Sequence, residues 1–160
     1  MADNLGKKWE ALFKRDFLKS LPDSTIDRIY DPVGKFKHVS NICDYIGYKE
    51  PNIFYLECKS CKGNTFNFAK LTQYKKLKEK WEEKVPGARI GVVIWFIDQK
   101  RVFYVPFTTV VQMKEVDGKK SVNCKKSQSE GYYIIEVDVE DYREYIKCDF
   151  RFLQDLKEGD

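Results

Sequence analysis

The chain has 160 residues, a length typical of one domain, and its 15% aromatic content supplies enough bulky side chains for a core, so we expect residues 1–160 to form a single domain. The net charge of +4 permits an anionic partner without requiring one. No apolar run is long enough to span a membrane, and the N-terminus lacks the apolar segment of a signal peptide. The five cysteines therefore indicate free thiols and a cytoplasmic location.

The hydrophobic pattern predicts an α/β domain built around a mixed sheet. Apolar side chains at helical spacing predict a first helix over residues 4–20, which Pro22 ends. The other predicted elements are, in chain order, strands over 25–30, 42–48 and 53–59, a helix over 68–84, a doubly buried strand over 90–97, its hairpin partner over 102–105, a lysine-rich mobile loop over 114–131 and a strand over 132–137. The pattern does not assign residues 140–160.

The segment ECKSCKG, residues 57–63, contains two competing motifs. Cys58 and Cys61 form a CxxC pair, which is typical of zinc or thiol redox sites. A structural zinc site needs four ligands, however, and the remaining cysteines are scattered while His38 is the only histidine. A redox CxxC usually opens a helix, whereas Gly63 breaks the chain here. We therefore interpret Cys58 as a small core residue, with a zinc or thiol protein as the alternative.

Glu57 and Lys59 form the second motif, ExK. Side chains alternate along a strand, so both point to one face while Cys58 points to the other. If the strands on either side of Pro51 pair as a hairpin, Asp44 can face Glu57, and two carboxylates and one ammonium then converge. Carboxylates bind Mg²⁺ or Mn²⁺, and such an ion assists phosphodiester hydrolysis. The alternative for Glu57 and Lys59 is a surface salt bridge without function.

The spacing of Asp44, Glu57 and Lys59, D-x₁₂-E-x-K, resembles the motif of the PD-(D/E)xK nucleases, and the chain further resembles the RecU family of Holliday junction resolvases. The likeness spans residues 4–106. The segments that carry it are NLGKKWE (4–10) with Glu10, CDYIG (43–47), FYLECKSCKGNTFNF (54–68), LTQYKKL (71–77) with Gln73, and GVVIWFIDQKRVFYVP (91–106). Residues 114–160 show no clear likeness to the C-terminal part of that family.

The resemblance implies a restriction-endonuclease-like fold, in which helices flank a mixed β-sheet, and a DNA endonuclease that uses Mg²⁺ or Mn²⁺. It implies that Asp44, Glu57 and the backbone carbonyl of Cys58 are metal ligands and that Lys59 is the catalytic lysine. It places Glu10 near the metal and lets Gln73 position the water or a phosphate. From the residues alone, Glu10 and Gln73 can equally be solvated helix positions.

The resemblance also implies a homodimer that makes paired nicks in branched DNA during recombination or repair. The chain departs from the family in one place, because residues 29–42 are too short for the stalk that enters the junction. They allow only a small basic finger with Lys35 and Lys37. Two alternatives therefore stay open: another structure-selective or restriction-type endonuclease acting on branched or duplex DNA, and an inactive DNA-binding relative.

Three lysine-rich clusters favour contacts with phosphates, although a charged cluster is usually only a solvated surface. Their members are Lys7, Lys8, Lys14 and Arg15 in the first helix; Lys62, Lys70, Lys75 and Lys76 around ExK; and Lys119, Lys120, Lys125 and Lys126 in the late loop.

Overall fold

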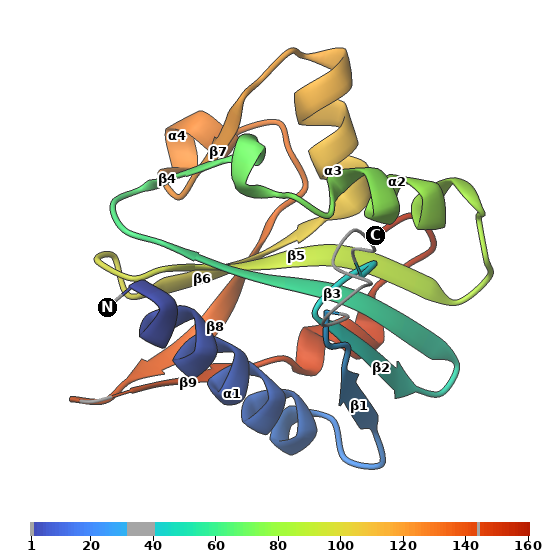
Figure 1. The fold of residues 1–160 in the computed structure, drawn as a ribbon, viewed down its shortest axis with the longest axis vertical. Helices are drawn as coiled ribbons and strands as arrows, with labels where there is room; N and C mark the ends of the chain where they lie inside the picture. Colours follow the sequence, from blue (N-terminus) through green and yellow to red (C-terminus); the bar gives the residue numbers. More distant parts are fainter. Residues whose placement is uncertain (1, 32–40, 144) are drawn as a thin grey trace.

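The computed structural model describes residues 2–31, 41–143 and 145–160, in which helices cover both faces of a curled, mixed sheet (Figure 1). Seven strands form this sheet in the order β1-β2-β3-β5-β6-β8-β9, and β4 and β7 form a separate two-stranded ribbon. Within the main sheet β3 and β5 run parallel, while the other neighbouring strands are antiparallel. This arrangement confirms the predicted α/β fold with a mixed sheet.

The described residues form nine strands, four α-helices and three further helical turns. The strands are β1 (Thr25–Arg28), β2 (Tyr45–Lys49), β3 (Asn52–Cys61), β4 (Thr65–Asn67), β5 (Ala88–Phe96), β6 (Arg101–Pro106), β7 (Ser121–Asn123), β8 (Ile135–Asp141) and β9 (Ile146–Asp149). The helices are α1 (Ala2–Ser20), α2 (Tyr74–Glu82), α3 (Phe107–Val111) and α4 (Lys126–Ser129), with the shorter turns η2 (Phe68–Lys70), η3 (Gln112–Val116) and η4 (Arg151–Asp155).

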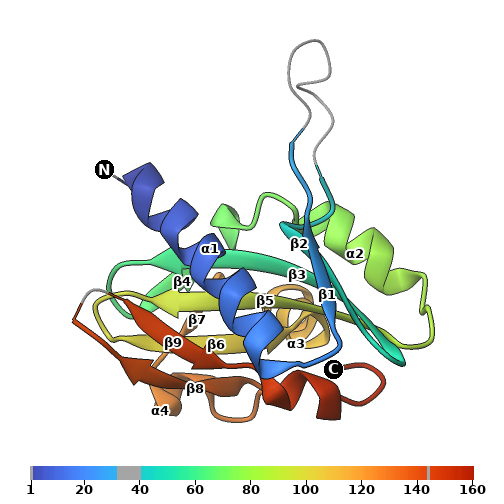
Figure 2. The same cartoon turned by 90° about the horizontal axis from the view of Figure 1, so that it is seen from below.

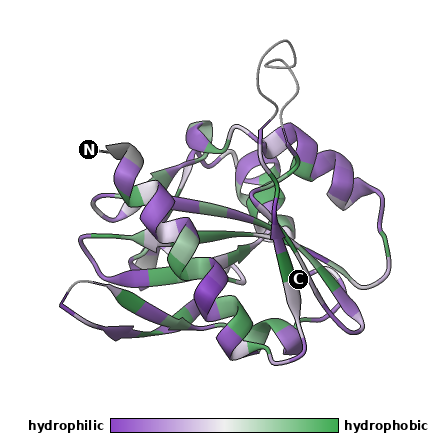
Figure 3. Cartoon of the chain, turned by 60° about the horizontal axis from the view of Figure 1, so that its bottom comes forward, coloured by the Kyte–Doolittle hydropathy of each residue, from purple (hydrophilic) through white to green (hydrophobic). Residues whose placement is uncertain are grey.

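Helix α1 covers one face of the sheet. Its apolar side chains Trp9, Phe13 and Phe17 recur at helical spacing, and all three are buried against the strands. The ring of Phe17 meets Phe54 of β3 edge to face at 5.9 Å. Figure 3 shows hydrophobic and hydrophilic residues following one another along α1. The periodicity therefore predicted this helix and its buried side correctly.

A second core lies on the opposite face, under α2, α3 and the β4–β7 ribbon. Phe66 of β4, Leu77 of α2 and Phe107 of α3 are buried in it. Strand β5 is buried on both faces from Arg89 to Phe96, as its continuous apolar run predicted. Figure 2 shows β1 and β2 crossing steeply over the direction of β5 and β6, which gives the sheet its curl.

The second half of the chain differs from its predicted elements. The predicted helix over 68–84 divides into η2 and α2, because Asn67 caps η2 by accepting a hydrogen bond from the Ala69 N–H at 2.8 Å. The predicted mobile loop over 114–131 was wrong, since it contains the end of η3, all of β7 and all of α4. Val122 and Cys124 of that segment are buried in the second core and anchor it. Residues 140–160 form the end of β8, then β9 and η4.

The predicted basic finger with Lys35 and Lys37 lies outside the described residues. Within those residues, no helix is long and apolar enough to cross a lipid bilayer.

Candidate active site

The hairpin of β2 and β3 brings Asp44 to Glu57. Tyr45 pairs with Leu56 in the antiparallel ladder, so the next position along each strand places Asp44 opposite Glu57. The backbone on either side holds Asp44 in place: its carbonyl accepts a hydrogen bond from the Ile29 N–H at 2.8 Å, and its Oδ2 accepts one from the Cys58 N–H at 2.8 Å. The structure thus brings together the two carboxylates that the sequence predicted to converge.

Lys59 completes this group. Its Nζ lies 2.7 Å from Glu57 Oε1, although the side chain of Glu57 is 0% exposed and that of Lys59 is 21% exposed. Cys58, between them, belongs to the core beneath α1. Alternation along β3 therefore sends the ExK pair to the face that carries α2.

Burial sets the electrostatics of the site. The pKa of Glu57 is raised to about 7: burial is the largest cause, the negative charge of Asp44 adds to it, and the Lys59 ammonium acts in the opposite direction. Burial also raises the pKa of Asp44, while the hydrogen bond from Cys58 N–H and the charge of Lys59 lower it. One lysine therefore faces two carboxylates whose ionised forms are poorly solvated, and a further cation would relieve this imbalance.

The donor set fits a hard divalent cation. Both carboxylate oxygens of Glu57 are buried, and the Lys59 ammonium lies 2.7 Å from Oε1. No group of three or more His, Cys, Asp or Glu side chains within the described part of the chain is placed to hold a metal. Two carboxylates suit Mg²⁺, since this ion keeps several waters and usually takes one or two carboxylates from the protein. The Cys58 carbonyl as a further ligand stays a prediction.

Gln73 reaches the site from the start of α2. It occupies the N-cap position, but its side chain makes no capping hydrogen bond. Its Oε1 instead accepts hydrogen bonds from Lys59 Nζ at 3.3 Å and from the Thr72 hydroxyl at 2.8 Å. Gln73 therefore restrains the ammonium of Lys59, and its predicted role toward water or phosphate stays a prediction.

Glu10 reaches the site from α1. Burial raises the pKa of Glu10, the charge of Asp44 raises it further, and the charges of Arg28 and Lys59 lower it. The Tyr45 hydroxyl donates a hydrogen bond to the Glu10 carbonyl at 3.0 Å, which joins α1 to β2 beside Asp44. All five side chains predicted for the site thus interact in one neighbourhood, and their catalytic roles stay predictions.

The comparison with known families decides the affiliation of the chain. The profile of the RecU family, described as Recombination protein U, matches residues 27–148. The chain belongs to this family. The match confirms the family predicted from the sequence and supports the prediction of a Holliday junction resolvase. It also extends past residue 106, so the RecU likeness continues through the segment 114–148 in which the sequence showed no clear resemblance.

A solved structure supports the RecU assignment at the level of the fold. The chain is similar to Hjc of Archaeoglobus fulgidus, described as a Holliday junction resolvase from an archaeal hyperthermophile. The TM-score is 0.53 at 19% sequence identity, over 74% of this chain and 88% of the other. Comparison with curated protein sequences gives no match.

Sequence reasoning missed one charged residue of this RecU site, Arg28 at the end of β1. It pairs with Tyr45 in the ladder and forms an ion pair with Glu10. Its charge lowers the pKa of both Asp44 and Glu10, and its buried Nε has no hydrogen-bond partner among the described residues. No spacing rule marks Arg28, because only the β1–β2 pairing brings it near Asp44.

The cysteines do not form a second chemical site. All five are free and buried. Cys58 and Cys61 contribute to the cores on opposite faces of the sheet, so the CxxC pair cannot bind one metal ion or close into a disulfide without rearrangement of β3. Burial raises the pKa of Cys61 to about 11 and that of Cys58 well above its ordinary value. The structure therefore favours the core interpretation over a zinc or thiol protein.

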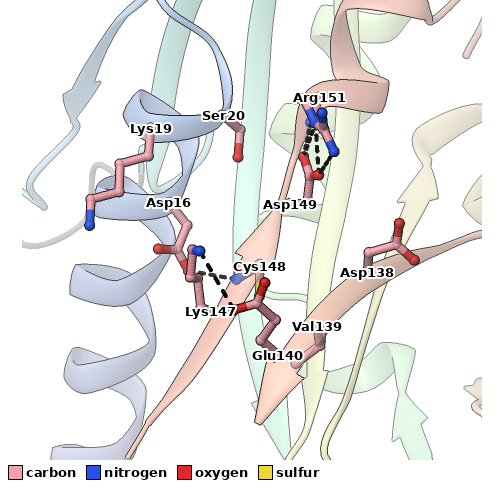
Figure 4. A pocket seen from close by; sticks show the side chains of 10 residues that line it. All are labelled: Asp16, Lys19, Ser20, Asp138, Val139, Glu140, Lys147, Cys148, Asp149 and Arg151. Atoms are coloured by element: carbon pink, nitrogen blue, oxygen red, sulfur yellow. Dashed lines mark hydrogen bonds and ion pairs between the residues drawn. The ribbon is translucent and has the colours of Figure 1, made fainter. Parts of the chain in front are cut away.

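A hollow of about 710 Å³ lies away from this site, between α1 and the β8–β9 pair (Figure 4). Five of its charged side chains have partners. Asp16 accepts a hydrogen bond from the Cys148 N–H at 2.8 Å, Arg151 pairs with Asp149, and Lys147 Nζ lies 3.6 Å from Glu140. None of the predicted site residues lines the hollow, so its volume does not mark the chemistry.

Proposed function

We propose that this RecU-family chain is a Holliday junction resolvase that hydrolyses DNA phosphodiesters with Mg²⁺ or Mn²⁺. One observation carries the proposal: Glu57 is fully buried, its Oε1 faces the Lys59 ammonium at 2.7 Å, and it lies beside Asp44 in the order of the nuclease motif. A buried carboxylate of this kind is expensive to keep for structure alone. It suits a site that holds a cation.

The residues divide the work in the following way. Asp44, Glu57 and the Cys58 carbonyl would hold the ion. When bound, the ion supplies positive charge against the scissile phosphate and lowers the pKa of water. The Lys59 ammonium, restrained by Glu57 and Gln73, donates hydrogen bonds to the attacking water or to a phosphate oxygen as negative charge develops. Glu10 and Arg28 flank Asp44 and hold α1 against the site.

The active form in this proposal is a homodimer in the cytoplasm. Resolution of a four-way junction needs two symmetric cuts, and a dimer with two-fold symmetry supplies one site for each strand.

The test compares cleavage of a synthetic four-way junction with cleavage of a linear duplex of the same sequence, in Mg²⁺, in Mn²⁺ and in chelator. We expect paired nicks in the junction only, lost in chelator and lost in Glu57→Gln. Exposed Glu79 of α2 offers a matched control, because Glu79→Gln removes the same charge outside the site. Equal cutting of junction and duplex would contradict resolvase activity. Absence of cutting by folded wild-type protein would contradict the nuclease itself.

A further inference from the structure

The β4–β7 ribbon and the turns beside it carry a surface of one charge. The outward side chains of the ribbon are neutral hydrogen-bonding groups, while Phe66 and Val122 point inward to the core. Figure 1 shows the ribbon and α4 gathered at one end of the sheet face that also carries α2 and α3. Six exposed lysines surround it, and we call this surface the lysine platform. Its members are Lys62, Lys70, Lys119, Lys120, Lys125 and Lys126.

None of these lysines forms an ion pair within the described part of the chain. Elsewhere Lys78 pairs with Glu115 at 2.8 Å, Lys80 with Glu83 at 2.7 Å and Lys100 with Asp141 at 2.6 Å. Acidic residues border the platform. Asp117 accepts a hydrogen bond from the Tyr132 hydroxyl at 2.7 Å, and Asp98 accepts one from the Gly63 N–H at 2.7 Å. Neither forms an ion pair with a platform lysine within the described part of the chain.

The platform also has a shaped centre. A hollow of about 460 Å³ is lined by Lys119 and Lys120 of the turn before β7, by Ser121 and Asn123 of β7, and by Gln128 and Glu130. Five of these six side chains can donate a hydrogen bond, and Glu130 is the one acidic member. Such a lining suits the oxygens of a phosphate, with lysine for charge and amide or hydroxyl groups for orientation.

The platform is joined to the nuclease site by seven residues of continuous, hydrogen-bonded chain. Asn67 of β4 pairs with Ser121 of β7, and the Phe68 N–H donates to the Lys120 carbonyl at 2.9 Å. The η2 turn carries Lys70 and leads to Gln73, whose Oε1 meets Lys59. A polyanion that reaches Lys59 can therefore continue over Lys70 to the ribbon.

We propose that the lysine platform binds the phosphate backbone of the duplex arm on one side of the scissile phosphate. This inference rests on the proposed nuclease function and adds where the substrate lies. The contacts are to phosphates, so they position the arm without reading its sequence. The DNA that touches the platform lies away from the centre of the junction, so the contribution of the platform depends on the length of the arms.

The test replaces three platform lysines whose side chains form no hydrogen bond, ion pair or ring contact with the described chain, in the variant Lys120→Gln, Lys125→Gln, Lys126→Gln. The control, Lys19→Gln, Lys49→Gln, Lys157→Gln, removes the same number of charges from exposed or half-buried positions outside the platform. Dissociation constants for long-armed and short-armed four-way junctions are measured in chelator over a range of salt concentrations. Circular dichroism verifies that both variants fold, and cleavage in Mg²⁺ is measured alongside.

On long arms we expect the platform variant to bind on the order of tenfold more weakly. The slope of the logarithm of the binding constant against the logarithm of the salt concentration should be shallower by about 2 to 3, because each of the three lost phosphate contacts contributes about 0.9 to it. On short arms it should match the wild type in binding and in cleavage. Unchanged binding to long arms, an equal loss on both arm lengths or an equal loss in the control would each overturn the proposal. Loss of cleavage by wild-type protein would instead count against the nuclease function, so the two failures are distinguishable.

Discussion

Glu57 combines complete burial with a weakly compensated charge, which is unusual for a glutamate. The Lys59 ammonium offsets part of the desolvation, while Asp44 opposes it, and the net result is a pKa of about 7 against an ordinary value of 4.5. The protonated form of Glu57 is therefore favoured in the folded protein. Stability and catalysis make opposite demands on this residue, because metal binding needs the ionised form.

We predict that Glu57→Gln stabilises the metal-free protein at high pH. Below pH 4.5 Glu57 is protonated in both the folded and unfolded states, so the two proteins should be equally stable. As pH rises from 4.5 to 7, Glu57 ionises in the unfolded chain while the folded protein keeps its proton, so the wild type loses stability and the glutamine variant does not. The difference in unfolding free energy should grow to about 3 kcal/mol above pH 7, at 1.36 kcal/mol per pKa unit.

Urea unfolding in chelator, below pH 4.5 and above pH 7, measures this difference directly. Glu79→Gln, which changes an exposed carboxylate on α2, should leave the stability almost unchanged at both pH values. Added Mg²⁺ should stabilise the wild type and have little effect on Glu57→Gln. A variant that is less stable than the wild type at high pH would show that Glu57 has a structural role and would weaken its assignment as a ligand.

The sequence predicted the position of Asp44, Glu57 and Lys59 for two physical reasons. Alternation along a strand places Glu57 and Lys59 on one face, and a short hairpin places Asp44 opposite Glu57. Arg28 could not be found in this way. It reaches the site through the pairing of β1 with β2 across residues 29–44, a separation over which no local pattern fixes the register.

At the scale of elements, α1 packs against β9, the last strand at one edge of the sheet. Edge strands present backbone donors that must find partners, and a helix can cover them. Asp16 of α1 is 1% exposed and accepts a hydrogen bond from the Cys148 N–H at 2.8 Å, while Arg15 donates to the Ile146 carbonyl at 3.1 Å. Both contacts join the first and last parts of the chain, and Figure 4 shows the one between Asp16 and Cys148 beside the hollow.

We predict that Asp16→Ala lowers the unfolding free energy by about 1–3 kcal/mol, because it leaves the buried Cys148 N–H without a partner. Lys14→Ala, on the exposed side of the same helix, should change it by less than about 0.5 kcal/mol. Chemical unfolding of both variants measures the effect. Equal stability of the two would mean that α1 is held by its apolar stripe alone.

Local signals predicted the elements that have a strong period, and they failed where distant pairing decides the structure. The stripe of α1 and the apolar run of β5 gave the correct element type. Strand β7 was predicted as part of a mobile loop because its three residues carry one apolar side chain, Val122. Only the pairing with β4, in which Val122 lies opposite Phe66, makes this segment a strand. Tertiary contacts of this kind leave no periodic trace in the sequence.

At the scale of the whole molecule, the described residues place Asp44, Glu57 and Lys59 in one group, so one chain has one proposed site. A four-way junction requires cuts in two strands of the same polarity, and a monomer would have to release and rebind between them. In a dimer with two-fold symmetry, the axis that relates the two sites also relates the two strands that must be cut. The proposed dimer therefore predicts how a half-active assembly behaves.

We predict that a heterodimer of one wild-type and one Glu57→Gln chain makes a single nick in a junction and does not resolve it. Two different affinity tags isolate the mixed dimer, and the products are separated on native and denaturing gels. Strand cleavage should remain within about twofold of half the wild-type rate, since each site carries its own machinery, while paired cuts should almost disappear. A dimer of two wild-type chains with the same tags is the control. Efficient resolution by the mixed dimer would show that one site can cut both strands, and the two-fold arrangement would then not be required for the reaction.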